Sequence, residues 1–276
     1  MIWTIITVLI LVAAIALYMF GGVFFKQEGK KASAMGIISY KGISALAIIL
    51  IAFSVCRLFT PVYLVKTNPA ILQEMVQSMQ AQQEQEKNKV VRQYVKDHVE
   101  DMIGSAPIVG DVNAKNTIFL WSDYSCPYCR RVHAELAAVM AERKDVRLVL
   151  KNFSIHGPLS DAPAKAVIAA KIQDNAKAAK LDELLMAKEY YSQDDMKDQS
   201  KLADKIQANV MKLAKEAGLD TKKLAADMEG DVVKAELQNV RELAQRFEIS
   251  GTPYLIIGDQ AFPGYIPKAK IIEALK

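Results

Sequence analysis

Cysteine and histidine are scarce in this chain, with three of each among 276 residues. Three cysteines are too few for a fold held together by many disulfides, and three histidines argue against a multi-histidine metal site. The sequence also has no internal repeats and no glycine-rich phosphate loop. These absences exclude a disulfide-rich scaffold, a repeat protein and a phosphate-loop nucleotide site.

An excess of charge of one sign is also missing from most of the chain. The net charge of +4 comes from 35 basic and 31 acidic residues, and the first 65 residues alone hold five basic side chains against one acidic. The remaining residues are balanced, so we expect no nucleic-acid partner. Apolar residues make up 51% of the chain, which with its length indicates about two folded units.

Two long apolar runs are present in the N-terminal part. Residues 2–25 carry no charge and, at about 1.5 Å per residue, are long enough to cross a hydrocarbon core about 30 Å thick. A second run, residues 37–60, spans if Lys41 and Arg57 reach opposite interfaces. Residues 1–65 are thus predicted to be a membrane anchor with two transmembrane helices, in contact with lipid.

The loop between the two runs carries Lys26, Lys30 and Lys31, which the positive-inside rule places in the cytoplasm. Everything after residue 65 then faces outward. With a single span, the second run would lie on the membrane or pack elsewhere, and the C-terminal part would stay in the cytoplasm. The second run has no amphipathic pattern, which favours two spans.

Residues 66–104 show helical spacing of apolar residues on both sides of a polar stretch at residues 80–89. The apolar stripe is narrow, so such a helix needs a partner surface. We predict a helical stalk that is either a solvated spacer or a site of homo-oligomerisation. His98 falls on the stripe, where a packed histidine is expected.

Strand and helix patterns alternate from residue 105 to residue 276, which predicts an α/β domain with parallel strands. Breakers at residues 104–113 indicate a boundary loop. Residues 160–247 have a helical composition, interrupted at Pro163, Gly218 and Gly230. The expected strands are residues 117–121, 146–152, 254–257 and a short one near 261–262, and the expected flanking helices are residues 126–143 and a closing helix from Pro267.

A Cys126-Pro127-Tyr128-Cys129 motif follows the first of these strands. At the start of a helix, unpaired amides and the helix dipole stabilise a thiolate on Cys126, which becomes the attacking group. Cys129 faces the same way one turn later and closes the disulfide. A zinc site would have His133 as a third ligand but no fourth, and c-type haem attachment would need histidine where Arg130 stands. No metal site and no cofactor are therefore expected.

Thr252 and Pro253 precede an apolar strand far along the chain. Proline at a strand start suggests a cis peptide bond that presents its backbone beside the two cysteines. An ordinary turn proline is the alternative.

These features resemble the DsbA-like branch of the thioredoxin superfamily over residues 105–276. The glutamine-rich helix before them is similar to that of suppressor-of-copper-sensitivity C proteins, whose stalks can trimerise. The resemblance implies a thioredoxin fold with a helical insertion at about residues 158–247, activity in the bacterial periplasm, Cys126 as nucleophile and Cys129 as resolving thiol. It also implies that Thr252 and Pro253 contact the substrate chain.

Three positions depart from or add to the family pattern. Leu120 stands where many relatives have a buried acid, so the proton of Cys129 must pass through water or another group. Tyr128 replaces the histidine of the strongest oxidases, which predicts a less oxidising disulfide. Asp123 is expected to cap the helix that follows it.

The sequence therefore predicts a periplasmic thiol:disulfide oxidoreductase, anchored in the bacterial inner membrane, that oxidises or isomerises disulfides of cysteine-containing envelope proteins. A membrane redox partner would recycle its cysteine pair. The alternative is a copper-binding or copper-protective module that uses the same two thiols.

Overall fold

The computed structural model describes residues 12, 49, 52–53 and 69–275. The predicted transmembrane helices, residues 2–25 and 37–60, lie outside the described residues except at four positions. Within the described part of the chain, no helix combines the length and apolarity needed to cross a membrane. The chain divides into two compact units, Met1–Gln82 and Gln83–Lys276.

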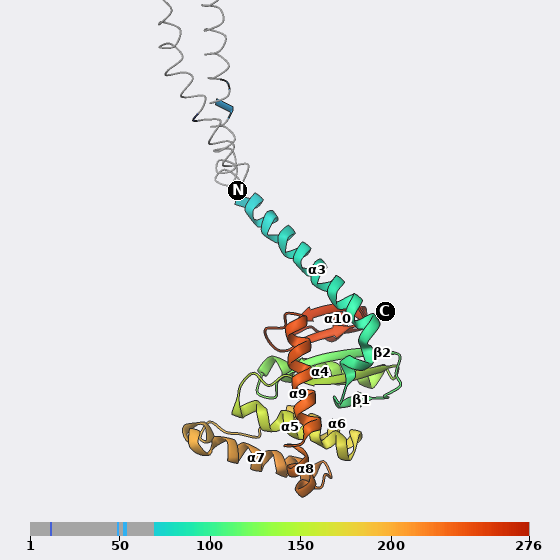
Figure 1. Cartoon of the computed structure of the whole chain (residues 1–276), viewed down its shortest axis with the longest axis vertical. Helices are drawn as coiled ribbons and strands as arrows, with labels where there is room; N and C mark the ends of the chain where they lie inside the picture. The colour runs from blue at the N-terminus through green and yellow to red at the C-terminus, as the bar shows by residue number, and fades with distance from the viewer. Residues whose placement is uncertain (1–11, 13–48, 50–51, 54–68, 276) are drawn as a thin grey trace, which may run out of the picture. The chain divides into compact units, whose positions relative to one another are not determined.

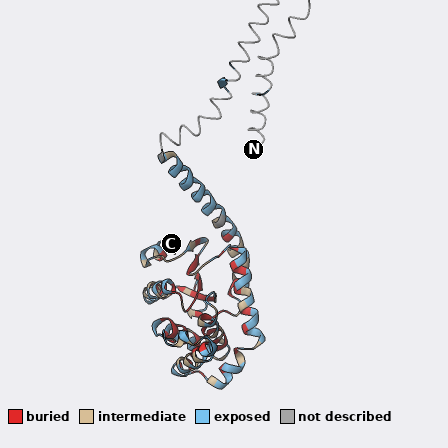
Figure 2. Cartoon of the chain, turned by 90° about the vertical axis from the view of Figure 1, so that its left-hand side faces the viewer, coloured by how far each residue is buried: buried red, intermediate tan, exposed pale blue. Residues whose placement is uncertain are grey.

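Helix α3, Pro69–Ile103, covers the predicted stalk. Within the second unit it buries Val91 and Met102, and it kinks at His98, where the backbone leaves the helical region. The His98 ring stacks on Tyr94 and its Nδ1 lies 3.1 Å from the Tyr94 carbonyl oxygen, so this histidine is packed, as expected. Figure 2 shows the contrast with residues 69–82, whose apolar side chains are exposed: Leu72, Met75, Val76 and Met79.

Gly104 ends α3 in the left-handed conformation, with φ of +52°. Its amide donates to the Glu100 carbonyl at 3.0 Å, which closes the last turn. A Cβ at this position would lie 2.9 Å from the Glu236 carboxylate. Both the backbone angle and the close approach therefore require glycine.

A five-stranded mixed sheet has the strand order β1-β3-β2-β4-β5. Only β2 and β3 run parallel, and α4, Pro127–Glu142, connects them as predicted. The predicted boundary loop is wrong in one detail, because β1 lies within it and pairs with β3; three residues are too few to show a strand pattern. The strands are β1 Ile108–Gly110, β2 Asn116–Ser122, β3 Val146–Asn152, β4 Tyr254–Ile257 and β5 Gln260–Pro263.

A block of helices stands between β3 and β4, as the sequence predicts, and α10, Lys268–Ala274, closes the chain. Figure 1 shows α5 to α8 gathered at one end of the sheet. The expectation of continuous helix is wrong at residues 188–194, which form an irregular loop before a short 3-10 turn, η1, Asp195–Lys197. The helices are α5 Pro158–Gln173, α6 Asn175–Ala187, α7 Gln199–Glu216, α8 Thr221–Asp227 and α9 Asp231–Arg246.

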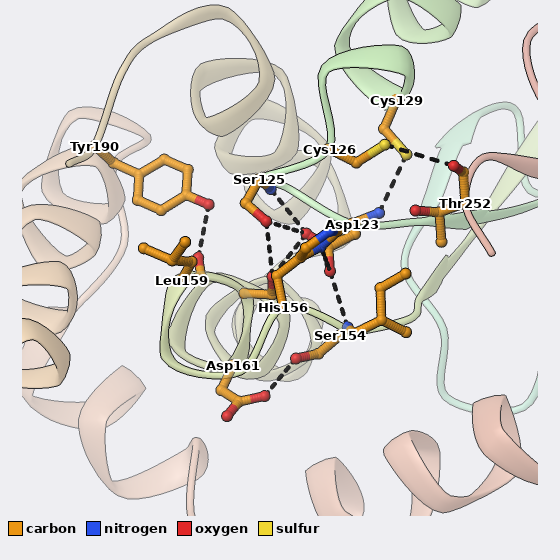
Figure 3. A network of polar contacts seen from close by, with 12 residues as sticks. Asp123, Ser125, Cys126, Cys129, Ser154, His156, Leu159, Asp161, Tyr190 and Thr252 are labelled. Atoms are coloured by element: carbon orange, nitrogen blue, oxygen red, sulfur yellow. Dashed lines mark hydrogen bonds and ion pairs between the residues drawn. The ribbon is translucent and has the colours of Figure 1, made fainter. Parts of the chain in front are cut away.

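Pro163 does not interrupt the helix, contrary to the prediction, but lies inside α5. Proline has no N–H to donate to the carbonyl four residues earlier, which is that of Leu159. The Tyr190 hydroxyl donates to this carbonyl instead, at 2.7 Å (Figure 3). A side chain from the irregular loop thus replaces the missing backbone hydrogen bond.

Alternate residues of β2 and β3 point to opposite faces of the sheet, and each face has its own core. One face packs against α4, α10 and the inserted helices through Ile118, Leu120 and Leu150. The other packs against the ends of α3 and α9 through Phe119 and Trp121.

Candidate active site

Cys126 lies between β2, which ends at Ser122, and α4, of which it is the N-cap residue. Pro127 occupies the first turn of the helix. Cys126 is 6% exposed, and its sulfur lies 3.5 Å from the Thr252 carbonyl oxygen. The unpaired amides and positive dipole end of α4 favour a negative charge on this sulfur.

Cys129 lies one turn further along α4 and is fully buried. The Asp123 amide donates to its sulfur at 3.4 Å. Burial raises the pKa of the Cys129 thiol to about 12, although hydrogen bonds from the Asp123 amide and the Thr252 and Ser122 side chains lower it. Both cysteines are free thiols, and Figure 3 shows their sulfur atoms side by side.

The Thr252–Pro253 peptide bond is cis, as the sequence predicts. The Gly264 amide donates to the Pro253 carbonyl at 2.8 Å and holds this loop against the end of β5. Thr252 faces the motif twice, with its carbonyl toward Cys126 and its hydroxyl toward Cys129. Among the described residues, its buried Oγ1 has no hydrogen-bond partner.

Asp123 organises the loop before the nucleophile rather than capping α4, which corrects the sequence prediction. Its Oδ1 accepts from the Ser125 amide, the Ser125 hydroxyl and the Ser160 hydroxyl at 2.8, 2.8 and 2.6 Å. Its Oδ2 accepts from the Ile155 amide and lies 2.9 Å from His156 Nδ1 (Figure 3). Burial raises the pKa of Asp123, but these hydrogen bonds outweigh burial and hold it below its usual value.

Tyr128 points into solvent, with 57% of the residue exposed. The Arg131 guanidinium lies 5.8 Å from the Tyr128 ring and 4.7 Å from the Tyr265 ring. Tyr128 occupies the motif position where the strongest oxidases of the family have histidine, and the Arg131 cation lies next to it. The sequence contains Arg131, but its packing between two tyrosines depends on Tyr265, in the loop between β5 and α10, and could not be read from the motif.

A second group of buried polar side chains lies on the face of the sheet that carries Cys129. The Tyr124 hydroxyl lies 2.8 Å from Asp182 Oδ1 and 3.1 Å from Asn152 Oδ1. His133 Nδ1 lies 3.6 Å from Asp182 Oδ2, and His133 Nε2 lies 3.5 Å from Ser122 Oγ. We call this group the rear cluster; its members are Ser122, Tyr124, His133, Asn152 and Asp182.

His133, the third ligand of the zinc alternative, thus contacts Ser122 and Asp182. In the described part of the chain, no group of three or more histidine, cysteine or acidic residues could hold a metal ion. The copper alternative predicted from the sequence uses the thiols of Cys126 and Cys129.

The family model described as Thioredoxin matches residues 103–276. A thioredoxin-like oxidoreductase from Silicibacter pomeroyi DSS-3 is 30% identical with a TM-score of 0.54, over 63% of this chain and 94% of that one. Proteus mirabilis ScsC in a transitional conformation is 25% identical with a TM-score of 0.53, over 79% and 93%.

The thiol-disulfide exchange protein alpha-DsbA2 from Wolbachia pipientis shares the fold, with 20% identity and a TM-score of 0.58 over 70% of this chain and 96% of that one. No protein of curated function matches the chain by sequence. The family match, the helical insertion and the cysteine pair at the start of α4 all indicate the same family. The chain therefore belongs to the thioredoxin family, with the helical insertion and the paired cysteines of its DsbA-like oxidoreductases.

Proposed function

We propose that the chain is a thiol:disulfide oxidoreductase anchored in the bacterial inner membrane, with its thioredoxin domain on the periplasmic side. Membership of the thioredoxin family supports the oxidoreductase activity. The anchor and its orientation rest on the apolar runs and the lysines between them in the sequence.

The observation that carries the proposed activity is the unequal placement of the two thiols. Cys126 caps a helix beside the cis-proline loop, whereas Cys129 is fully buried behind it with a pKa of about 12. Cys126 keeps 6% of its surface exposed, whereas Cys129 has none. Stepwise disulfide exchange needs such a difference, because the second thiol must attack only after the first has reacted.

In the reducing direction, the Cys126 thiolate attacks one sulfur of a substrate disulfide. A mixed disulfide forms, and the other substrate sulfur leaves as a thiolate. Cys129 then loses its proton and attacks the Cys126 sulfur, so that the Cys126–Cys129 disulfide forms and the second substrate thiolate leaves. Two electrons pass from enzyme to substrate. The reverse sequence oxidises a substrate dithiol.

A cavity of about 400 Å³ beside the motif supports a polypeptide substrate. It lies between the start of α4 and the irregular loop at residues 188–194, so a chain segment next to the reacting sulfur has room there. Its lining is mixed, which suits extended polypeptide: Ser125, Pro127, Arg130, Met186, Tyr191 and Met196. Cysteine-containing envelope proteins are the proposed substrates, and a membrane redox partner would restore the cysteine pair.

The exposed apolar stripe of residues 69–82 supports the proposal that the stalk self-associates. Leu72, Met75, Val76 and Met79 recur at helical spacing and are each 45–65% exposed. A second copy of the same helix would cover them.

Reactivation of scrambled ribonuclease by the purified full-length chain tests the activity. We expect catalysis by the natural sequence, loss of catalysis in Cys126→Ser, and unchanged catalysis in Cys56→Ser, which removes the cysteine outside the motif. Equal rates with Cys126→Ser and the natural sequence would remove the proposal.

Metal analysis of protein purified under reducing conditions tests the copper alternative, which requires bound copper that Cys126→Ser loses.

A further inference from the structure

Closing the disulfide requires the Cys129 thiol to lose its proton. The residue is fully buried, so solvent does not reach its sulfur, and burial raises its pKa to about 12. Leu120, also fully buried, offers no acid or base on this face of β2. If the chain exchanges disulfides as proposed above, the proton needs a route through the protein.

The rear cluster lies next to the Cys129 sulfur. Ser122, which is 3% exposed, ends β2 on the same face of the sheet as Cys129, and the amide of the next residue, Asp123, donates to the Cys129 sulfur at 3.4 Å. The Ser122 side chain also lowers the pKa of the Cys129 thiol. The same hydroxyl lies 3.5 Å from His133 Nε2. His133 lies one helical turn after Cys129 on α4, so both side chains project toward the sheet.

We propose that Ser122 and His133 form the route by which the proton leaves Cys129, with Asp182 positioning the imidazole. As Cys129 attacks the Cys126 sulfur, its S–H proton passes to Ser122 Oγ while the Ser122 hydroxyl proton passes to His133 Nε2. The imidazole becomes an imidazolium, and no electrons move along the route. In the oxidising direction, the imidazolium returns the proton to the departing Cys129 thiolate.

Tyr124 determines which imidazole nitrogen is free to accept. The Tyr124 hydroxyl has one hydrogen, which it donates to Asp182 Oδ1 at 2.8 Å. The Asn152 amide can be turned so that its nitrogen, in place of its oxygen, faces Tyr124 and donates to the Tyr124 oxygen. This turn also gives a partner to Asn152 Nδ2, which otherwise has none among the described residues. Asp182 Oδ2 then receives the Nδ1–H of His133, and the Nε2 lone pair faces Ser122.

The charges around His133 keep the ring ready to accept a proton. Burial and the Arg130 guanidinium on α4 lower its pKa, while Asp182 on α6 raises it, and the net direction is downward. The imidazole is therefore neutral in the dithiol protein at neutral pH. Asp182, whose own pKa burial raises, faces His133, Tyr124 and Glu183.

A pocket of about 520 Å³ between α4 and α6 gives the route its outlet. His133 and Asp182 form part of its lining, and Lys180 and Glu183 also line it. A proton that arrives on His133 can pass to solvent in this pocket without returning past the substrate. The contacts of 3.5 and 3.6 Å are long for hydrogen bonds, so transfer needs a shift of a few tenths of an ångström, as is common before a reacting complex forms.

The two chemical steps can be separated with dithiobis(nitrobenzoate) as the disulfide probe, in full-length protein with Cys56→Ser. Attack by Cys126 releases the first nitrothiophenolate, and resolution by Cys129 releases the second. We expect Ser122→Ala and His133→Gln to slow the second release about tenfold or more at neutral pH and to leave the first unchanged. In the natural sequence, the second rate falls as the pH drops below the usual histidine value, and both variants lose this inflection.

Ser122→Thr keeps a hydroxyl and is expected to resolve within about twofold of the natural rate. Asn239→Ala is the matched control, since it perturbs the partly buried contact of Asn239 with Lys151 on the opposite face of the sheet. We expect it to lower the melting temperature and to leave the pH profile of the second release unchanged. A second release that is unaltered in Ser122→Ala and His133→Gln would overturn the route. Failure of the first release would instead overturn the proposed function.

A measurement on the unmutated dithiol protein covers the case in which the variants do not fold. Nitrogen NMR of the His133 ring reports which nitrogen carries the proton. The route requires the neutral ring with hydrogen on Nδ1. A ring with hydrogen on Nε2 in the dithiol protein could not accept from Ser122 and would overturn the proposal.

Discussion

Lys151 and Asn152 are neighbours in β3, but their side chains belong to two different buried polar groups on opposite faces of the sheet. Lys151 points to the face of α3 and α9, where its Nζ meets Glu236, Asn239 and the Ile103 carbonyl at 2.7, 2.9 and 3.2 Å. The second Glu236 oxygen accepts from the Ser105 amide at 2.8 Å. We call this group the lysine cluster. Asn152, the next residue, points into the rear cluster behind Cys129.

The difference lies in how completely each group is satisfied. Lys151 Nζ and both carboxylate oxygens of Glu236 make hydrogen bonds of ordinary length. The two side chains are almost wholly shielded from solvent. The rear cluster has two contacts of 3.5 Å or more, which join His133 to Ser122 and to Asp182. A fully paired group fixes the positions of α3, β3 and α9, whereas a loosely paired one leaves a proton free to move.

Breaking the lysine cluster is expected to have the largest effect on stability. Glu236→Gln leaves a buried ammonium without its counter-charge, and we expect a loss of about 3–5 kcal/mol in urea unfolding. The rate of disulfide exchange per folded molecule should not change, because the cluster does not touch the cysteines. The double variant Lys151→Met with Glu236→Leu should recover part of the loss, and a Glu236→Gln protein as stable as the natural one would contradict this account.

The same variant should show a characteristic pH dependence. Burial already lowers the pKa of Lys151 from its usual 10.5, and Glu236 counteracts that shift, so removing Glu236 lowers the pKa further. Between the folded and unfolded values, the unfolded chain binds more protons, and stability then rises with pH. The deficit of Glu236→Gln should therefore shrink as the pH is raised toward 10.5, which melting curves over this range would reveal.

Tyr124→Phe is expected to have an intermediate effect, because it leaves Asp182 and Asn152 buried with one partner fewer each. We expect a loss of about 1–3 kcal/mol at neutral pH. Tyr124 holds down the pKa of Asp182, which burial raises, so the variant raises it further. A carboxyl whose pKa is raised by folding destabilises the fold as the pH rises, and the loss should be smaller in acid. Unfolding curves at several pH values test this, and an equal loss at every pH would contradict it.

Thr252→Val should have the smallest effect on stability. Its buried hydroxyl has no hydrogen-bond partner among the described residues, so its removal leaves no nitrogen or oxygen atom unpaired. We expect stability to change by less than about 0.5 kcal/mol. The pKa of Cys129 should rise, since this hydroxyl lowers it. Titration of thiolate absorbance in a Cys126→Ser background measures that rise, and a fall would contradict the assigned contact.

Local patterns predicted much of the fold and the motif. The strands at residues 146–152 and 254–257 agree with the structure, because buried apolar runs bounded by turn residues are strong signals. The cis bond before Pro253 also followed from a local feature, a proline at a strand start. The roles of Cys126, Cys129, Pro127, Tyr128, Thr252 and Pro253 in catalysis and substrate binding stay predictions.

Features that depend on distant residues could not be predicted. Helix α5 continues through Pro163 because Tyr190, in a loop 27 residues later, supplies a hydrogen bond to Leu159. Asp123 was expected to cap a helix, but its partners Ile155, His156 and Ser160 come from the segment after β3. His133 and Asp182 are equally separate in sequence, and only the packing of α6 on α4 brings them together.

Mapping the covalent intermediate tests the central claim most directly, namely that Cys126 attacks and the buried Cys129 resolves. Cys129→Ser protein, incubated with a disulfide-bonded peptide and digested for mass spectrometry, should accumulate the peptide on Cys126, whereas the natural sequence should release it and form the Cys126–Cys129 disulfide. Peptide found only on Cys56, or none retained by Cys129→Ser, would contradict the account.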